Sequence, residues 1–233
     1  LRQGYGLTET SPVISVNREN CNNPVTVGQP IPGLQIRLGD IEELQVKGPT
    51  VMKGYWKRPD ATAEVFTEDG WFRTGDQADL SDAGRIRIKG RIKEIIVTST
   101  GEKIPPTDME LAIQTDPLFE QVMVVGEARP FITALAVVNE AEWEKFAKEF
   151  NVDPSDDRML MRRDIRMAAL KRLKKAASRF PQYGIPRNIR LLKEHWTVDN
   201  GCLTVTMKLR RPIIREKLRA EIDELYTVPQ NNV

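Results

Sequence analysis

The sequence predicts a mixed α/β fold, in which a small antiparallel sheet or barrel is followed by a compact α+β domain. Three observations lead to this prediction: short extended runs between Val27 and Gly54, a run that alternates apolar and charged residues from Arg85 to Lys89, and helical spacing of apolar residues after Glu140. A period of two is typical of strands and a period near 3.6 of helices. With 233 residues, 40% of them apolar, the chain is long enough for one or two domains.

Charge and cysteine content argue against several classes of protein. The 35 Lys and Arg and 33 Asp and Glu leave a net charge of +2, so we expect no nucleic-acid partner. Cys21 and Cys202 lie far apart without metal-ligand spacing, which predicts free thiols in a reducing cytoplasm. We find neither a leader nor an apolar run of about 20 residues, and expect a soluble, at most membrane-peripheral protein. Because the chain starts at Leu1 inside a motif, we expect a piece of a longer protein.

The first motif, QGYGLTETS from Gln3 to Ser11, predicts a glycine-rich loop. Such a loop can lay the ring of Tyr5 against a planar ligand while Thr8 and Glu9 present oxygen atoms. Oxygen ligands at this spacing suit Mg²⁺ beside phosphate. The alternative is an ordinary turn with a capping threonine.

Short extended runs follow, and they predict a small antiparallel sheet or barrel. Their sequences are LQIRL, EELQVKG and TVMKGYW. The segment DATAEVF after Pro59 predicts a short helix, and Asp69-Gly70 predicts a turn. Asp76 follows a glycine at the end of a predicted strand, where a carboxylate can accept hydrogen bonds from the vicinal hydroxyls of ribose. The alternative is a turn aspartate that caps its own backbone.

Two strand-like runs flank the pair Gly90-Arg91, which we interpret as a joint. Ile86 and Ile88 alternate with charged residues, and a shorter apolar run covers residues 95–97. Two prolines then exclude a strand, and Thr107 with Glu110 matches a capping box, so a helix should begin near Asp108.

The remaining sequence predicts a compact α/β domain. Residues 121–126 and 132–138 are apolar runs typical of a β-hairpin, and residues 140–150 favour a helix. A long helix is predicted between Arg158 and Arg179, with apolar residues at helical spacing and a strongly basic opposite face. That face is either solvated or attracted to the phosphates of a ligand or to an anionic membrane surface. His195 has no evident partner, so we assign it to packing or surface.

Five segments, taken in order, resemble the adenylate-forming superfamily, and most closely its long-chain fatty acyl-CoA synthetases. They are GYGLTET, VMKGYW, DGWFRTGD, GRIKEIIVTSTGEKIPPTDME and NGCLTVTMKLRR. The likeness runs over essentially the whole chain but covers only the C-terminal portion of a typical member. It implies that residues 1–90 complete a large AMP-binding domain and that residues 91–233 form a mobile C-terminal domain.

The resemblance also implies roles for residues of the first part. Tyr5 corresponds to the aromatic residue that stacks on adenine, Thr8 to a hydroxyl that contacts phosphate, and Glu9 to the Mg²⁺ ligand. Asp76 would hold the ribose hydroxyls with help from Arg91.

Three further positions carry roles by the same resemblance. Lys93 stands at the hinge about which the C-terminal domain rotates, and Gly101 lies in a loop that approaches the pantetheine arm of CoA. Lys208 matches the lysine that bridges the carboxylate substrate and the nucleotide, where a cation relieves the repulsion between two anions. The chain departs from the usual LTPT at residues 203–206, where Val205 replaces proline and loosens the predicted turn, and from the usual Gly-Glu pair at Glu42-Glu43.

The activity implied is that of an ATP-dependent, AMP-forming fatty acid–CoA ligase, with ATP, Mg²⁺ and CoA as cofactor and substrates. The upstream part of the large domain would be a partner, and we expect these 233 residues alone to be inactive. Two alternatives stay open. The acyl group is passed to a carrier protein, or the chain is a non-catalytic nucleotide-binding module.

Overall fold

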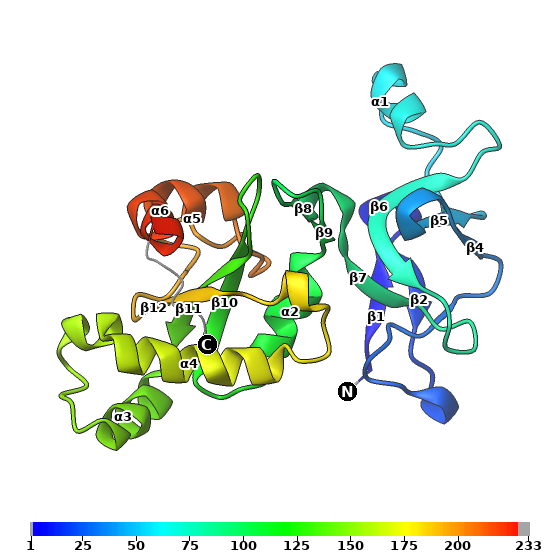
Figure 1. Cartoon of the computed structure of the whole chain (residues 1–233). Coiled ribbons are helices and arrows are strands. Elements are labelled where there is room, and N and C mark those ends of the chain that lie inside the picture. Colours follow the sequence, from blue (N-terminus) through cyan, green and yellow to red (C-terminus); the bar gives the residue numbers. More distant parts are fainter. Residues whose placement is uncertain (1, 228–233) are drawn as a thin grey trace. The chain divides into compact units, whose positions relative to one another are not determined.

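The computed structural model describes residues 2–227 and divides the chain into two units, Leu1–Ile95 and Ile96–Val233, each described here by itself (Figure 1). Both units mix strands with helices, and most strands pair in small antiparallel sheets. The mixed α/β class predicted from the sequence is confirmed.

Two antiparallel sheets form the first unit. The smaller contains β1 (Gly4–Gly6), β2 (Val13–Val16) and β3 (Gln29–Pro30). The larger contains, in chain order, β4 (Gln35–Leu38), β5 (Glu43–Lys47), β6 (Phe72–Asp79) and β7 (Arg87–Arg91). Helix α1 (Pro59–Glu64) lies between β5 and β6 in sequence, where the short helix was predicted. Apolar side chains of both sheets share one core, which includes Ile14, Leu44, Val46, Ala78 and Ile86.

Three predictions for the first unit were wrong in detail. Residues 50–56 form turns and bends rather than a strand. The pair Gly90-Arg91 forms the end of β7, where Gly90 is opposite Gln77, so it is part of a sheet and not a joint. Asp76 lies within β6 rather than at its end. In the last two cases the hydrogen bonds of a neighbouring strand extend the ladder past the glycine, which the local pattern could not reveal.

A three-stranded mixed sheet is the centre of the second unit. Strand β10 (Phe119–Val125) pairs antiparallel with β11 (Thr133–Val138), as the predicted hairpin requires, and β11 pairs parallel with β12 (Asn188–Leu192). A separate two-stranded pair, β8 (Ile96–Val97) and β9 (Lys103–Ile104), precedes it.

Helices cover both faces of this sheet (Figure 1). One face bears α2 (Pro106–Ile113), α3 (Glu140–Glu149) and α4 (Arg163–Ala176), and the other bears α5 (Arg211–Lys217) and α6 (Arg219–Thr227). Successive residues of a strand point to opposite faces, so Val122 and Val124 join the first core while Met123 and Val125 join the second. Burial on both sides explains why β11 reads as a continuous apolar run.

Two helix predictions need correction. The helix predicted over residues 158–179 is a short 3₁₀ turn, Asp157–Met161, followed by α4, which begins only at Arg163. Helix α2 begins at Pro106, and no side-chain capping bond forms at its N-terminus. Proline at the first helical position has no N–H to be capped, and the Glu110 carboxylate is occupied by partners outside the helix.

Candidate functional site

Strand pairing brings Asp76 and Arg91 together. They are opposite each other in the register of β6 and β7, and Arg91 Nε lies 2.8 Å from Asp76 Oδ1. The Asp76 side chain is only 5% exposed, and a buried carboxylate requires a charged or hydrogen-bonding partner. Thr74 Oγ1 accepts the Asp76 N–H and donates to the carbonyl oxygen of Leu44. The carboxylate is therefore held in a fixed position.

Tyr5, a third predicted site residue, contacts the same carboxylate. It is the middle residue of β1, and its hydroxyl donates a hydrogen bond to Asp76 Oδ2. Burial raises the pKa of the Tyr5 hydroxyl most, and the nearby charge of Asp76 raises it further. The hydroxyl is therefore protonated at neutral pH and can donate a hydrogen bond. The structure thus brings Tyr5, Asp76 and Arg91 into one cluster.

Glu9 and Thr8 lie on a 3₁₀ turn, Thr8–Thr10, that follows β1. The Tyr55 hydroxyl donates to Glu9 Oε1 at 2.8 Å, and the N–H of Met52 donates to the Glu9 carbonyl oxygen at the same distance. Thr8 is exposed. Two contacts from residues 52–55 therefore fix the backbone and the side chain of Glu9.

The Glu9 carboxylate fits a magnesium ion bound largely by phosphate. Among residues 2–227, no group of three or more His, Cys, Asp and Glu side chains could hold a metal ion by itself. Mg²⁺ in nucleotide sites commonly takes one or two carboxylates, with phosphate oxygens and water completing the octahedron. Tyr55 engages Oε1, and a carboxylate has further acceptor positions on its second oxygen.

Lys93 lies at the end of the first unit. It is an exposed residue of a 3₁₀ turn, Ile92–Glu94, and the unit ends at Ile95. The Ile95 N–H donates to the carbonyl oxygen of Ile92, which closes the turn. A short turn of this kind, at the end of a unit, is a position at which a few residues can absorb a change in backbone angles.

Gly101 lies in the turn between β8 and β9, in the second unit. Its φ is +87°, in the region that favours glycine, and its N–H donates to the Thr98 carbonyl oxygen at 3.0 Å. The Glu102 carboxylate accepts hydrogen bonds from the hydroxyls of Thr98 and Thr100, which lowers its pKa. The turn is thus well defined, and a Cβ at Gly101 would meet no atom within 4 Å.

Lys208 is exposed on a tight loop that precedes α5. The N–H of Thr204 donates to the Lys208 carbonyl oxygen at 2.9 Å, and the Lys208 N–H donates to Thr204 Oγ1 at 3.1 Å. The hydroxyls of Thr204 and Thr206 lie 3.0 Å apart, within hydrogen-bond distance. These contacts close the turn although Val205 stands where a proline was expected, and the predicted loosening stays a prediction.

Comparison with known protein families shows to which family this chain belongs. Residues 1–56 match the AMP-binding enzyme family, and residues 93–229 match the AMP-binding enzyme C-terminal domain. The second match alone covers more than half of the chain. The chain belongs to the AMP-binding enzyme family.

Curated relatives of this chain include ligases with two kinds of acceptor. The long-chain-fatty-acid–CoA ligase FadD15 of Mycobacterium bovis is 37% identical over 96% of this chain and 38% of its own length. The long-chain-fatty-acid–[acyl-carrier-protein] ligase AEE15 of Arabidopsis thaliana is 33% identical over 97% of this chain and 32% of its own length. The chain thus spans less than two fifths of the length of these relatives.

A solved structure shares the fold. The A domain of a carboxylic acid reductase from Segniliparus rugosus, in complex with AMP and a co-purified carboxylic acid, has a TM-score of 0.73 and 26% identity. The match covers 97% of this chain and 35% of that chain. The described residues thus have the architecture of the C-terminal portion of an adenylation domain.

Two contacts in and near the candidate site were not predicted from the sequence. Tyr55 lies in VMKGYW, a run that the sequence predicts as a strand, and this prediction does not reveal its contact with Glu9. Glu110 was interpreted as a helix cap, whereas it pairs with Arg211. The residue types alone do not reveal either contact, because each joins segments distant in sequence.

The basic face of α4 is partly neutralised within the second unit. Arg162 pairs with Asp164, Arg172 pairs with Asp116, and Arg166 donates to Asn188 Oδ1. The exposed basic residues of the helix are Arg163, Lys171, Lys174 and Lys175. Contact of this face with CoA or with a membrane stays a prediction. None of the helices within residues 2–227 has both the length and the apolar content that crossing a bilayer requires.

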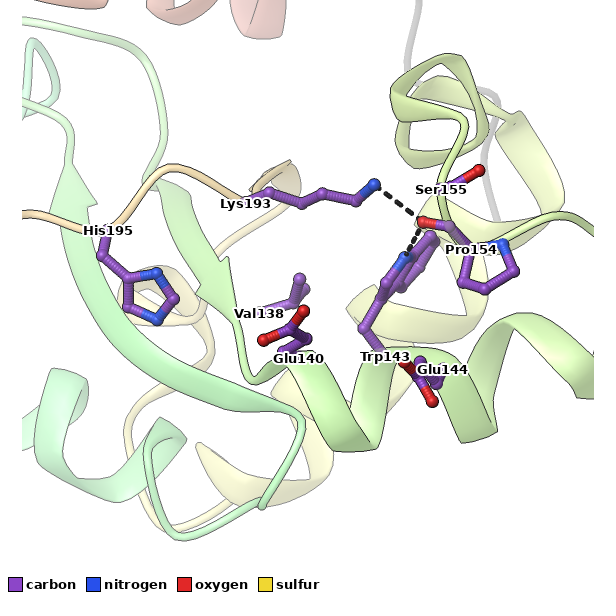
Figure 2. Close-up of a pocket in the computed structure, with 8 residues that line it drawn as sticks. All are labelled: Val138, Glu140, Trp143, Glu144, Pro154, Ser155, Lys193 and His195. Carbon is purple, nitrogen blue, oxygen red and sulfur yellow. Dashed lines mark hydrogen bonds between the residues drawn. The ribbon is translucent and has the colours of Figure 1, made fainter.

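The second unit also contains a cavity of about 340 Å³ between α3 and the segment after β12 (Figure 2). Its basic side chains are engaged by neighbours. Lys193 donates to the Pro154 carbonyl oxygen and to Asp157, and His195 Nε2 lies 3.2 Å from Glu120 Oε1. The prediction that His195 lacks a partner was therefore wrong. The lining residues are Val138, Glu140, Trp143, Glu144, Pro154, Ser155, Lys193 and His195. The cavity contains none of the predicted site residues, and the ammonium of Lys193 is paired with Asp157.

Proposed function

We propose that this chain is the C-terminal part of an AMP-forming ligase that joins a long-chain fatty acid to CoA. Membership of the AMP-binding enzyme family and the similarity to FadD15 over 96% of the chain support this proposal. Residues 1–90 would complete the large domain, residues 91–233 would form the mobile domain, and the missing part of the large domain would be supplied upstream.

The Tyr5, Asp76 and Arg91 cluster is the observation that carries the proposal. It joins three separate sequence motifs at one buried carboxylate, which is the chemistry needed to accept hydrogen bonds from sugar hydroxyls. In this role Asp76 holds the ribose, Arg91 fixes the carboxylate, and the ring of Tyr5 packs against adenine.

Glu9 and Thr8 would act on the phosphates. Mg²⁺ bound at Glu9 would neutralise phosphate charge, and the exposed hydroxyl of Thr8 would donate to a phosphate oxygen. Tyr55 would hold the Glu9 carboxylate in the orientation that the ion requires.

Lys208 would act in the first of two half-reactions. In that step the fatty acid carboxylate attacks the α-phosphate of ATP, giving acyl-adenylate and pyrophosphate, and the Lys208 ammonium stabilises the charge that collects on the oxygens. A rotation at Lys93 would then withdraw Lys208 and bring the Gly101 turn to the site. The CoA thiol attacks the acyl carbon, and AMP leaves.

A carrier protein is the second candidate acceptor. AEE15, whose name specifies the acyl carrier protein, is nearly as similar to this chain as FadD15. The chemistry assigned to Tyr5, Asp76 and Lys208 is the same for both acceptors, because the acyl-adenylate is formed before the acceptor reacts. The acceptor must therefore be identified by experiment.

The test uses the full-length protein that carries this chain, with ATP, Mg²⁺, CoA and a panel of fatty acids. AMP, acyl-adenylate and acyl-CoA are followed by mass spectrometry, beside Lys208→Ala and the control Lys148→Ala, an exposed lysine of α3. We expect long-chain acyl-CoA from the wild type, and a Lys208→Ala protein that forms no adenylate yet still transfers from supplied acyl-adenylate. Adenylate that accumulates without acyl-CoA favours a carrier protein as acceptor, and an absence of both refutes ligase activity. The 233 residues alone should form neither product.

A further inference from the structure

A buried ion pair joins α2 to the first residue of α5. Arg211 Nη1 and Nη2 donate to the two carboxylate oxygens of Glu110, each at 2.6 Å. The side chains are only 15% and 6% exposed, and 101 residues separate them in the chain. Two parallel charge-assisted hydrogen bonds fix orientation as well as distance. A change in the direction of Glu110 would therefore move Arg211.

Glu110 is itself held on a rigid part of the second unit. Its Oε1 also accepts the N–H of Val124 in β10, at 2.8 Å. Its neighbours on α2, Met109 and Ile113, are fully buried in the core against the sheet. The carboxylate thus links a packed helix and a central strand to Arg211.

Arg211 stands three residues beyond Lys208, at the point where the loop becomes a helix. The base of this loop is closed by a hydrogen bond from the Arg210 N–H to the Cys202 carbonyl oxygen at 2.8 Å and by a bridge between Leu203 and Leu209. Three extended residues span no more than about 11 Å, so the anchor at Arg211 limits where Lys208 can lie.

We infer that Glu110 is a positioning residue for Lys208, acting through Arg211. The inference rests on the function proposed above for Lys208. Glu110 would then take part in adenylate formation. Its place in the sequence does not suggest this role, because it lies on the helix that follows the Gly101 turn. Glu110 does not touch a reacting atom in this scheme. Its contribution is to hold the ammonium of Lys208 near the oxygens on which negative charge develops. A displacement of a reacting or stabilising group by about 1 Å can lower a rate by about a hundredfold.

The test compares Glu110→Gln with Asp116→Asn in the full-length protein that carries this chain. Asp116 pairs with Arg172 at 2.6 Å in the same unit, so its variant controls for the loss of a comparable ion pair away from Lys208. We expect Glu110→Gln to lower the rate of adenylate formation about ten- to hundredfold and to leave transfer from supplied acyl-adenylate within about twofold of wild type. Asp116→Asn should leave both half-reactions near wild type. If Glu110→Gln does not fold, Arg211→Lys keeps the charge but loses the paired hydrogen bonds.

A second readout separates this inference from the proposed function. In protein labelled with ¹³C at methionine methyl groups, the signal of Met207, next to Lys208 and 68% exposed, reports the order of the loop without any reaction. It should sharpen and shift in Glu110→Gln and stay unchanged in Asp116→Asn. An unchanged Met207 signal, or an equal loss of both half-reactions, overturns the positioning role. A wild type that makes no adenylate overturns the proposed function even if the Met207 signal moves.

Discussion

The hydroxyl of Tyr5 donates a hydrogen bond to Asp76, although 71 residues separate them in the chain. Arg91 engages the other oxygen of the same carboxylate. Each carboxylate oxygen has two acceptor positions, so a sugar hydroxyl can share Asp76 with these donors or replace one of them. The protein thus satisfies the buried negative charge of Asp76 with donors of its own.

Replacing Asp76 by asparagine should weaken AMP binding. Hydrogen bonds to a charged group contribute about 1.5–3 kcal/mol, so we expect the dissociation constant to rise about ten- to hundredfold. Isothermal titration calorimetry of the full-length protein measures it. Asp79→Asn, on the same strand, is the matched control and should bind AMP like wild type. Equal affinity in Asp76→Asn and wild type would remove Asp76 from the nucleotide site.

Tyr5→Phe should make stability less sensitive to alkaline pH. Burial and Asp76 raise the pKa of the Tyr5 hydroxyl above the value of about 10 that tyrosine has in an unfolded chain. The hydroxyl's contribution to stability is therefore complete below about pH 10 and is lost as the pH rises toward the folded-state value. Between pH 10 and 11 the free energy of unfolding of wild type should fall by up to about 1.4 kcal/mol more than that of Tyr5→Phe. Urea unfolding at a series of pH values measures both slopes, and identical slopes would contradict the assignment.

Tyr55→Phe should raise the Mg²⁺ concentration that supports half-maximal adenylate formation. The variant removes only the hydroxyl that donates to Glu9 Oε1 at 2.8 Å. Loss of an outer-shell partner weakens metal binding by about 10- to 100-fold in closed sites, and because Tyr55 is 36% exposed we expect the lower end of that range. Titration of Mg²⁺ at fixed ATP gives the value. Tyr183→Phe removes an exposed hydroxyl of the second unit and should behave like wild type. The assignment fails if both variants respond alike.

Local sequence patterns were sufficient to predict those strands and helices that have similar surroundings along their length. The hairpin of β10 and β11 forms from two apolar runs, as their composition predicts. Ile86 is buried in the first core, although the strand predicted from Arg85 begins only at Arg87. Local sequence patterns failed where a contact with a residue distant in the sequence determines the structure. Thr107 and Glu110 match a capping box, but Glu110 gains more from two charge-assisted bonds to Arg211 than from a cap.

In the candidate site, too, local patterns predicted some features and failed for those that depend on distant residues. Motifs identified Tyr5, Glu9, Asp76 and Lys208, because each stands in a short segment of distinctive composition. The contacts that orient them join separate segments, as between Glu9 and Tyr55, and no single segment contains that information. The roles assigned to these residues stay predictions until the variants are measured.

Gly101→Ala should lower thioester formation while leaving adenylate formation intact, the reverse of the effect expected for Lys208→Ala. A Cβ at this position meets no atom within 4 Å, so the substitution creates no clash inside the unit. The positive φ of 87° makes alanine less stable there by about 1–2 kcal/mol, which a folded domain tolerates. If the Gly101 turn approaches the pantetheine arm, the added methyl group occupies space that the arm needs.

Gly84→Ala is the matched control for this last prediction. Gly84 has a φ of 74°, and a Cβ there also meets no atom within 4 Å, so the backbone penalty is the same. The two variants should lose similar stability in urea unfolding, and only Gly101→Ala should slow transfer from supplied acyl-adenylate to CoA, by about tenfold or more. Equal transfer rates in the two variants would contradict the predicted approach of the Gly101 turn to the pantetheine arm. Because a carrier protein presents the same pantetheine arm, Gly101→Ala should impair transfer to either acceptor.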